Sequence, residues 1–396
     1  MKSIGNIHMN IQASCYIFLC VSLIYFPALT FLLSLGMIFF LGDTKILRWI
    51  IYPPLIISFT LISISRDIFS TYKDDFITYY FMYDALVHKL FENYFGIEVG
   101  LASLNFLIEA LLPHLSPREL LFIYVTIQVL LIVFLIETYI DKVKIKEPAT
   151  LVGLVFLFMP FLAFTLTIRQ NIAVILMVIA FFIGSRIYKY MILILSALFH
   201  LSVVPIMIII YAIWYLSNKS YLTILCVFAV SFLLLGQSIQ YIGDLPKLRA
   251  FSSENLDFDF FVYFSYYKTT MFLLCLLILF RNDKNKKFIK SIFVIIIITF
   301  CLDYHLPYVS FRLTQPFILL LGVGYFIFYN NLEYAINKVL FRTAFFVSFI
   351  IFKSYVSIYG DSDFSLFRSI EMYSQEPFYY LHNINENMST VDRSKL

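Results

Sequence analysis

Charge is what this sequence has least of. Only 14% of its 396 residues are Asp, Glu, Lys or Arg, whereas 61% are apolar, and its mean hydropathy is +0.87. Soluble domains carry about 25% charged and about 45 to 50% apolar residues, so the composition indicates a polytopic membrane protein. The net charge of +4 is small and lies mostly in short loops. We therefore interpret it as an orientation signal and predict no nucleic-acid partner.

Other signals are missing as well. The five cysteines all lie in apolar runs, with no CxxC or metal-ligand spacing, so they are predicted to face lipid or to pack. We find no internal repeat, coiled-coil heptad or Gly-rich phosphate loop. No clustered ligand pattern demands a metal, and no cofactor is predicted. The first apolar run is long and lacks a small-residue cleavage site, so we expect it to remain as a span.

Long apolar runs dominate the rest of the chain. A membrane-crossing helix needs roughly 20 mainly apolar residues. The candidate runs are 13–41, 46–64, 99–115, 118–140, 149–167, 170–184, 190–216, 220–242, 262–280, 288–303, 312–330 and 341–358. They predict an all-α polytopic protein with about 11 to 13 transmembrane or re-entrant helices. We expect one membrane-embedded domain over residues 1–358, with an external loop at 65–98 and a polar tail at 359–396.

Basic residues orient these runs. Short cytoplasmic loops collect Lys and Arg, and the clearest signals are KVKIK at 142–146 and RNDKNKKFIK at 281–290. Weaker signals are Lys45 with Arg48, Arg186 with Lys189, Lys219, and Lys338 with Arg342. All of these are expected on one side of the membrane.

The 36 residues from Ala149 to Gly184 lie between two basic loops. One helix of that length would be about 54 Å long, whereas a bilayer core is about 30 Å thick. Two helices fit, with the turn between them at 167–171. Arg169 is therefore predicted at the outer end of a hairpin, not in mid-membrane.

Similar reasoning suggests two short helices within 190–216 that meet at 199–202, although a single tilted helix of this length is an alternative. The loop 65–98 has more acidic than basic residues and is predicted to be external. The segment 99–115 must then be interfacial or re-entrant. On this topology Arg169, His200, Asp303, His305 and Arg312 share the outer face.

Arg169 is the first candidate for chemistry. An arginine in a membrane segment is unfavourable by roughly 2.5 to 3.5 kcal/mol at a helix centre and usually faces a polar cavity or substrate path. Gln170 and Asn171 extend the polar cluster, and Arg312 lies at an independent external helix end. Guanidinium groups form paired hydrogen bonds to phosphate, so these two arginines are predicted to hold a lipid-linked diphosphate. The alternative is that Arg169 snorkels to lipid headgroups.

His200 is a candidate general base for a sugar hydroxyl or a neutral donor to phosphate; alternatively it bonds only a backbone carbonyl. His305 is a further substrate-binding candidate. The acids of the outer loop are candidates for sugar binding, for metal binding or for a base, and together with aromatic side chains they could hold sugars. Each acid could instead be only a solvated charge, and tyrosines also gather at membrane interfaces. The acids are Asp67, Asp74, Asp75, Asp84, Glu92 and Glu98, and the tyrosines include Tyr79.

Four quoted stretches carry a family resemblance, together with the acidic loop. TIRQNIAVILMVIA at 167–180, followed by LILSALFHLSVVPIMI at 193–208, resembles the "IRQ...A" and "FH.S" segments of EpsG-type and Wzy-type O-antigen or exopolysaccharide polymerases. The acidic loop and EVGLASLNFLIEAL at 98–111 are similar to the acidic loop and "E.G...LN.L" of those proteins. Arg312 in SFRLTQPF is similar to an arginine near their C-terminal spans. One departure is Val203, where relatives often have a small residue.

This resemblance implies a membrane glycosyltransferase of GT-C-like architecture in the bacterial inner membrane. It would join oligosaccharide repeat units carried on undecaprenyl diphosphate at the periplasmic face, as in lipopolysaccharide biosynthesis. Its partners would be this substrate, membrane lipids and a possible chain-length regulator protein. The main alternative is a flippase for the lipid-linked oligosaccharide, which would also hold diphosphate with arginines. The long asymmetric outer loop and the lack of repeat-related halves favour the polymerase. A membrane acyltransferase is a weaker alternative, because His8 precedes the first span.

Overall fold

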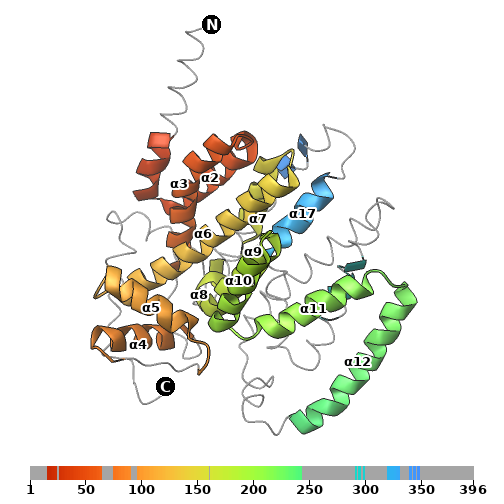
Figure 1. The fold of residues 1–396 in the computed structure, drawn as a ribbon. Helices are drawn as coiled ribbons and strands as arrows, with labels where there is room; N and C mark the ends of the chain where they lie inside the picture. Colours follow the sequence, from red (N-terminus) through yellow and green to blue (C-terminus); the bar gives the residue numbers. More distant parts are fainter. Residues whose placement is uncertain are drawn as a thin grey trace. The chain divides into compact units, whose positions relative to one another are not determined.

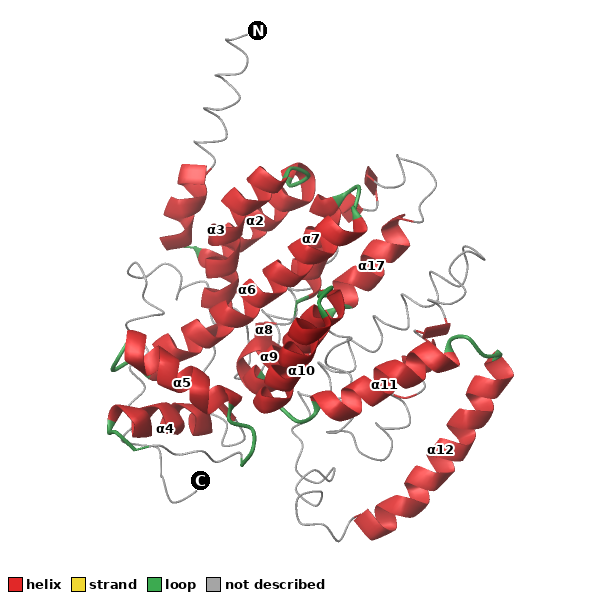
Figure 2. Ribbon diagram, viewed as in Figure 1, coloured by secondary structure: helices red, strands yellow, loops and turns green. Residues whose placement is uncertain are grey.

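The computed structural model describes residues 16–24, 26–64, 75–90, 96–159 and 161–242, together with shorter pieces of the chain between 290 and 347. These pieces are 290–291, 293–295, 298, 319–330, 339–340, 342–344 and 346–347. Within these ranges the regular structure is helical and no strand is present, which confirms the all-α expectation for the described residues (Figure 2).

After a helical segment at 16–24, the named helices follow in chain order (Figure 1). They are α2 (Pro27–Leu41), α3 (Lys45–Ile64), α4 (Asp75–Val87), α5 (Gly100–Leu111), α6 (Pro117–Val143), α7 (Pro148–Phe158), α8 (Phe161–Leu166), α9 (Ile168–Phe182), α10 (Arg186–Phe199), α11 (Val203–Leu216), α12 (Tyr221–Ile242) and α17 (Leu321–Asn330). The chain divides into two compact units, Met1–His200 with Tyr334–Leu396, and Leu201–Glu333.

Among the residues that the structure describes, two helices, α3 and α6, are long and apolar enough to cross a membrane. Shorter apolar helices include α2, α5, α7, α9 and α11. The segment predicted to be interfacial or re-entrant is α5, whose 12 residues extend about 18 Å and are too few to cross a bilayer core. The predicted number of spans, the GT-C-like architecture and the single domain over residues 1–358 stay predictions.

Two helix breaks, at Thr167 and at 200–202, fall where the sequence predicted them, and a third was not predicted. The break at Thr167 separates α8 from α9 and puts Arg169 in the first turn of α9. A second break follows Phe158, so residues 148–182 form three helices instead of the expected two. Pro160 explains this difference, because proline lacks the amide hydrogen that a continuous helix needs. Residues 200–202 separate α10 from α11, which confirms two short helices over 190–216.

Local sequence signals fix the ends of α6. Ser116 accepts a hydrogen bond from the Glu119 amide, and the Glu119 side chain accepts one from the Ser116 amide at 2.7 Å, which makes a capping box. Pro117 occupies the first turn, where its missing amide hydrogen does no harm. The helix ends at Lys144, whose φ of 55° is left-handed. This 27-residue helix is the element against which α3, α8 and α9 pack.

Aromatic rings form the core between α2, α3 and α8. The Phe59 ring stacks on Phe161 with centroids 4.7 Å apart, and Phe31 meets Phe161 edge-on at 5.3 Å. On the neighbouring helix α7, Gly153 lies against Phe39 of α2 so closely that a Cβ there would be 1.9 Å from the ring. This glycine therefore sets how closely α2 and α7 approach, as small residues do at membrane helix interfaces.

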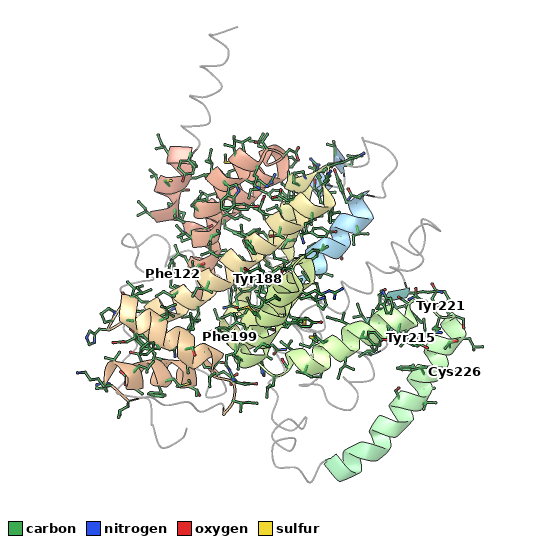
Figure 3. All side chains as sticks on the ribbon, in the orientation of Figure 1. Phe122, Tyr188, Phe199, Tyr215, Tyr221 and Cys226 are labelled. Carbon is green, nitrogen blue, oxygen red and sulfur yellow. The ribbon has the colours of Figure 1, made fainter. Side chains whose placement is uncertain are left out.

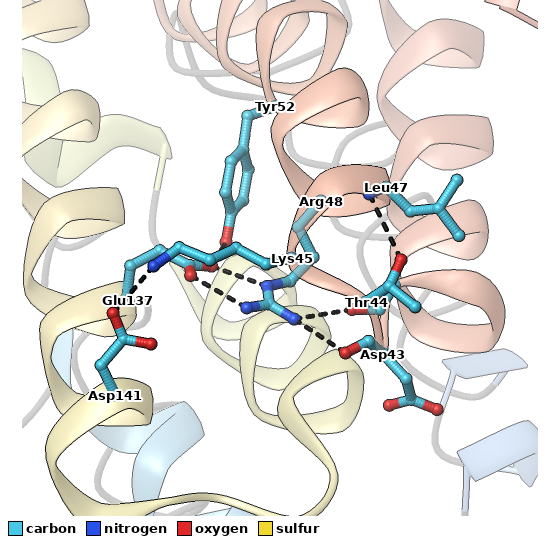
Figure 4. Close-up of polar contacts among 9 residues, drawn as sticks. Asp43, Thr44, Lys45, Leu47, Arg48, Tyr52, Glu137 and Asp141 are labelled. Atoms are coloured by element: carbon cyan, nitrogen blue, oxygen red, sulfur yellow. Dashed lines mark hydrogen bonds and ion pairs between the residues drawn. The ribbon is translucent and has the colours of Figure 1, made fainter.

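Cations gather at one end of the first unit (Figure 4). Arg48 donates to both carboxylate oxygens of Glu137 at 2.7 and 2.9 Å, and Tyr52 donates to the same carboxylate at 2.5 Å. A further guanidinium nitrogen donates to the carbonyls of Gly42 and Asp43. A two-point ion pair between buried side chains thus joins α3 to α6. Tyr52 and the backbone carbonyls bond to the remaining polar atoms of this pair.

Two other basic residues of this unit, Lys45 and Arg342, lie close to the same basic run. Lys45 pairs with Asp141 at 2.8 Å, directly before the 142–146 run, and Arg342 pairs with Glu147 directly after it. The rings of Tyr139 and Phe182 are 5.4 Å apart, so the end of α9 also reaches this region. These described basic residues therefore gather at one end, as the sequence predicted.

The second unit repeats this pattern. Lys290 donates to the carbonyl of Lys219 at 2.7 Å, so two basic signals separated by some seventy residues lie together. Tyr215 and Tyr221 flank this turn between α11 and α12 (Figure 3). The ammonium of Lys219 lies 4.7 Å from the Tyr215 ring centroid, and that of Lys290 lies 5.2 Å from the Tyr221 centroid. Tyrosine with lysine is typical of a membrane interface.

Replacing Gly153 by Ala should destabilise the protein by about 1 to 3 kcal/mol through overpacking against Phe39. The result would be the opposite of the usual gain of about 1 kcal/mol for Gly→Ala inside a helix. Thermal unfolding of the detergent-solubilised protein measures this effect. Gly184→Ala is the matched control, since its Cβ would meet nothing within 4 Å. Phe39→Leu should restore part of the stability of the Gly153→Ala variant, and an unchanged melting temperature in Gly153→Ala would contradict the packing described.

Candidate active site

Arg169 lies in the first turn of α9 with only 6% of its surface exposed. Its Nη1 donates to Oε2 of Glu98 at 2.5 Å, and its Nε donates to the Tyr79 hydroxyl at 3.1 Å. The guanidinium also lies 5.4 Å from the centroid of the Tyr79 ring. The protein itself therefore supplies an anion for this arginine.

The second oxygen of the same carboxylate contacts His200. Nδ1 of the imidazole lies 2.9 Å from Glu98 Oε1. An ionised carboxylate can only accept hydrogen bonds, so Nδ1 carries the hydrogen in this contact. In the neutral imidazole the basic nitrogen is then Nε2. Glu98 thus bridges a cation and a histidine that come from different helices.

Tyr79 extends this chain of contacts to the outer loop. Its hydroxyl, which accepts from Arg169, donates to Oδ2 of Asp75 one turn earlier on α4, at 3.2 Å. We call Asp75, Tyr79, Glu98, Arg169 and His200 the Arg169 cluster. It holds two carboxylates and one guanidinium, so it carries excess negative charge unless His200 is protonated.

Three helix ends meet at this cluster. Arg169 stands at the positive end of the α9 dipole, which is unfavourable for a cation and is offset by Glu98. Glu98 precedes the first turn of α5, where an anion is favoured. His200 caps the C-terminal end of α10, where a positive charge is favoured. The helix dipoles therefore support an anionic Glu98 and a His200 that can accept a proton.

Close backbone contacts bring these helices together. A Cβ on Gly100 would lie 2.9 Å from the side chain and the backbone nitrogen of Phe199, which is labelled in Figure 3. Glycine therefore lets the start of α5 touch the end of α10, two residues from Glu98 and one from His200. Ser196 donates to the carbonyl of Ala173 at 2.6 Å and holds α10 against α9. These contacts set the distance between the carboxylate and the imidazole.

The α4 helix is held beside α5 by a second tyrosine. Tyr83 donates to the carbonyl of Leu112 at 2.9 Å and accepts from the Leu115 amide at 3.1 Å. Burial raises the pKa of the Tyr83 phenol, so the hydroxyl stays protonated and can donate. This contact fixes the outer-loop helix that carries Asp75 and Tyr79.

A layer of buried amides lies behind the cluster. Asn171 donates to Gln128 of α6 at 2.8 Å, and Gln128 donates to the carbonyl of Phe164 at 2.9 Å. Asn105 donates to the Tyr79 carbonyl at 3.3 Å and accepts from the Tyr124 hydroxyl. Such satisfied networks rigidify a core, so they hold α4, α6 and α9 in register. Gln170 is also buried.

The sequence-predicted site residues thus divide into three groups. Four of them, Arg169, His200, Asp75 and Tyr79, belong to one cluster. Gln170 and Asn171 lie next to it in α9, and their assignment to substrate binding stays a prediction. The remaining four lie outside the described residues: Asp67, Asp74, His305 and Arg312.

Glu98 is the residue whose importance the sequence did not reveal. It was one of six loop acids, and nothing in its spacing set it apart as the partner of Arg169. The available signal was its position two residues before Gly100 in the "E.G...LN.L" segment. Across the described part of the chain, no group of three or more His, Cys, Asp or Glu side chains is arranged to hold a metal ion.

The three short motifs of the resemblance meet in space. Glu98, Gly100 and Asn105 come from "E.G...LN.L" and contact, respectively, Arg169, Phe199 and Tyr124. Ala173 of "IRQ...A" accepts from Ser196, and His200 of "FH.S" contacts Glu98. Three motifs that are far apart in the sequence therefore contact one another around the Arg169 cluster.

The comparison with protein families agrees with this convergence. The model of the EpsG family matches residues 49–370, a range that contains the whole Arg169 cluster. No curated protein and no solved structure matches the chain. The match covers most of the 396 residues and includes the whole of α6 and most of α3, the two helices of membrane-spanning length. The chain therefore belongs to the EpsG family, and its family and apolar helices indicate a membrane protein with a polysaccharide polymerase-like function.

Proposed function

We propose that this protein is a polysaccharide polymerase of the bacterial inner membrane. It joins oligosaccharide repeat units that are carried on undecaprenyl diphosphate, and it does so at the periplasmic face. The observation that carries this proposal is the contact of His200 with the buried Glu98 carboxylate, which leaves Nε2 of a neutral imidazole as a base. Glycosyl transfer to a sugar hydroxyl needs such a base.

The reaction forms one bond and breaks one. A hydroxyl oxygen at the non-reducing end of one repeat unit attacks the anomeric carbon of the growing chain. The bond from that carbon to the diphosphate oxygen breaks, and the lipid diphosphate leaves with the bonding electrons. Nε2 of His200 takes the proton of the attacking hydroxyl. No oxidant, reductant or further co-reactant is required.

The two arginines have different parts in this proposal. Arg169 acts through Glu98 and Tyr79, because its guanidinium already bonds to both. Arg312 is the cation for the diphosphate, where it stabilises the negative charge that grows on the leaving group. Asp75 and Tyr79 place an acid and an aromatic ring beside the base, a combination suited to holding a sugar. A chain-length regulator protein is a proposed partner.

Arg169→Lys and Arg312→Lys should each abolish long polysaccharide chains while the protein inserts normally. Lysine keeps the charge but lacks the planar fork, so an ammonium at position 169 could not bond to Glu98 and Tyr79 in the same geometry. Gel analysis of extracted polysaccharide, with immunoblots of the membrane fraction, measures both properties. Arg186→Lys, at an exposed position on α10, is the control. Wild-type chain length in both test variants would exclude these roles.

Deleting the gene should leave single repeat units on the surface acceptor, because units would still cross the membrane. A flippase would instead give loss of all surface sugar and accumulation of lipid-linked units in the cytoplasm. Mass spectrometry of the surface glycan and of the lipid-linked pool separates the two outcomes. The second outcome would reject the polymerase in favour of a transporter.

Reporter fusions test the proposed sidedness. Fusions after Asp75, Arg169 and His305 should show periplasmic activity, and fusions after Ile145 and Asn285 should not. The physical reason is that Arg169 lies at the start of α9, which contacts Gln128, whereas the basic run 142–146 follows Tyr139, which contacts Phe182 at the other end of α9. Equal reporter activity after Ile145 and Arg169 would contradict this topology.

A further inference from the structure

We infer that Glu98 is a positioning residue that holds His200 as the general base, and that Arg169 sets how strongly it does so. This inference rests on the proposed function. It concerns a residue for which the sequence offered no individual role, and it makes the ion pair of Arg169 part of the reaction chemistry instead of a structural contact alone.

The geometry of the carboxylate is the first reason. Each of its oxygens has a separate partner, Arg169 at 2.5 Å and His200 at 2.9 Å, so the carboxylate plane cannot rotate without losing one of them. A carboxylate bonded to Nδ1–H fixes both the ring orientation and the tautomer of a histidine. The reactive nitrogen is thereby kept at Nε2.

The balance of charge is the second reason. A buried carboxylate without a cation is strongly unfavourable. Arg169 removes this penalty, and it also withdraws part of the negative charge that would stabilise an imidazolium at His200. The groups that face His200 or lie behind its partner are Glu98 before α5, Arg169 on α9, and Tyr79 with Asp75 on α4. Glu98 is therefore the anion that faces His200, and Arg169 is the cation that partly neutralises this anion.

The packing at Gly100 is the third reason. Because its missing Cβ allows contact with the backbone of Phe199, the separation of Glu98 and His200 depends on the contact between α5 and α10. A static ion pair between Arg169 and Glu98 would not need this approach. The contact between Gly100 and Phe199 therefore controls the distance between the Glu98 carboxylate and the His200 imidazole.

The test uses the full-length protein in liposomes, with lipid-linked repeat units extracted from cells that lack it. In the wild type, kcat/KM should rise with pH to a plateau, because a general base acts only in its unprotonated form. Glu98→Gln should lower the plateau by about 10²-fold. It should also move the rising limb to lower pH, because the anion that stabilised the imidazolium is gone. Arg169→Gln makes no long chains, so its profile is measured on the residual joining of two repeat units; that limb should move to higher pH, because Glu98 then acts uncompensated.

Three further variants guard against simple misfolding. Glu98→Asp keeps the negative charge but shortens the side chain. It should therefore lower activity, while the rising limb of its pH profile should lie closer to that of the wild type than the limb of Glu98→Gln does. Gly100→Ala should separate α5 from α10 and shift the limb in the direction of Glu98→Gln. Glu109→Gln, on the same helix α5, is the control and should keep the wild-type profile.

The outcomes separate this inference from the proposed function. If the wild type polymerises but Glu98→Gln and Gly100→Ala keep the wild-type pH profile, Glu98 has only a structural role and the inference is overturned. If the wild type makes no polymer from the extracted units, the proposed function itself fails. Where Glu98→Gln does not insert, the profiles of Glu98→Asp and Gly100→Ala decide the question.

Discussion

The described part of the first unit depends on one buried carboxylate. Glu98 is buried, and one of its carboxylate oxygens is bonded to Arg169 while the other is bonded to His200. These two contacts bring together the start of α5, the start of α9 and the end of α10. The glycine at position 100 and the buried amides behind Tyr79 belong to the same arrangement, since each allows or holds that approach.

A comparison of two buried ion pairs shows why this one suits chemistry. Arg48 and Glu137 are joined at two points, and the remaining polar atoms are used by Tyr52 and by backbone carbonyls. The partners there are an arginine, a glutamate, a tyrosine and backbone carbonyls, which together form a fixed clamp between α3 and α6. Glu98 instead contacts a histidine as well as an arginine, and histidine is the side chain whose charge changes most readily near neutral pH.

The two pairs also separate the ends of the unit by function. The end with Arg48 collects exposed lysines and the ion pairs of the connecting loops, which suits an anionic membrane surface. The other end carries the acidic outer-loop helix and a base candidate.

The sequence by itself determined the helical class, the apolar character that indicates a membrane protein, the grouping of basic residues and the helix breaks at Thr167 and at 200–202. Those properties follow from local composition and length, which a bilayer of fixed thickness converts directly into structure. The predicted topology also placed Arg169 and His200 on one face. Only the tertiary structure decided that Glu98, among six similar loop acids, joins them, and that Asn171 bonds to Gln128. These pairings link positions 43 to 102 residues apart, so they depend on how helices pack and leave no periodic trace in the sequence.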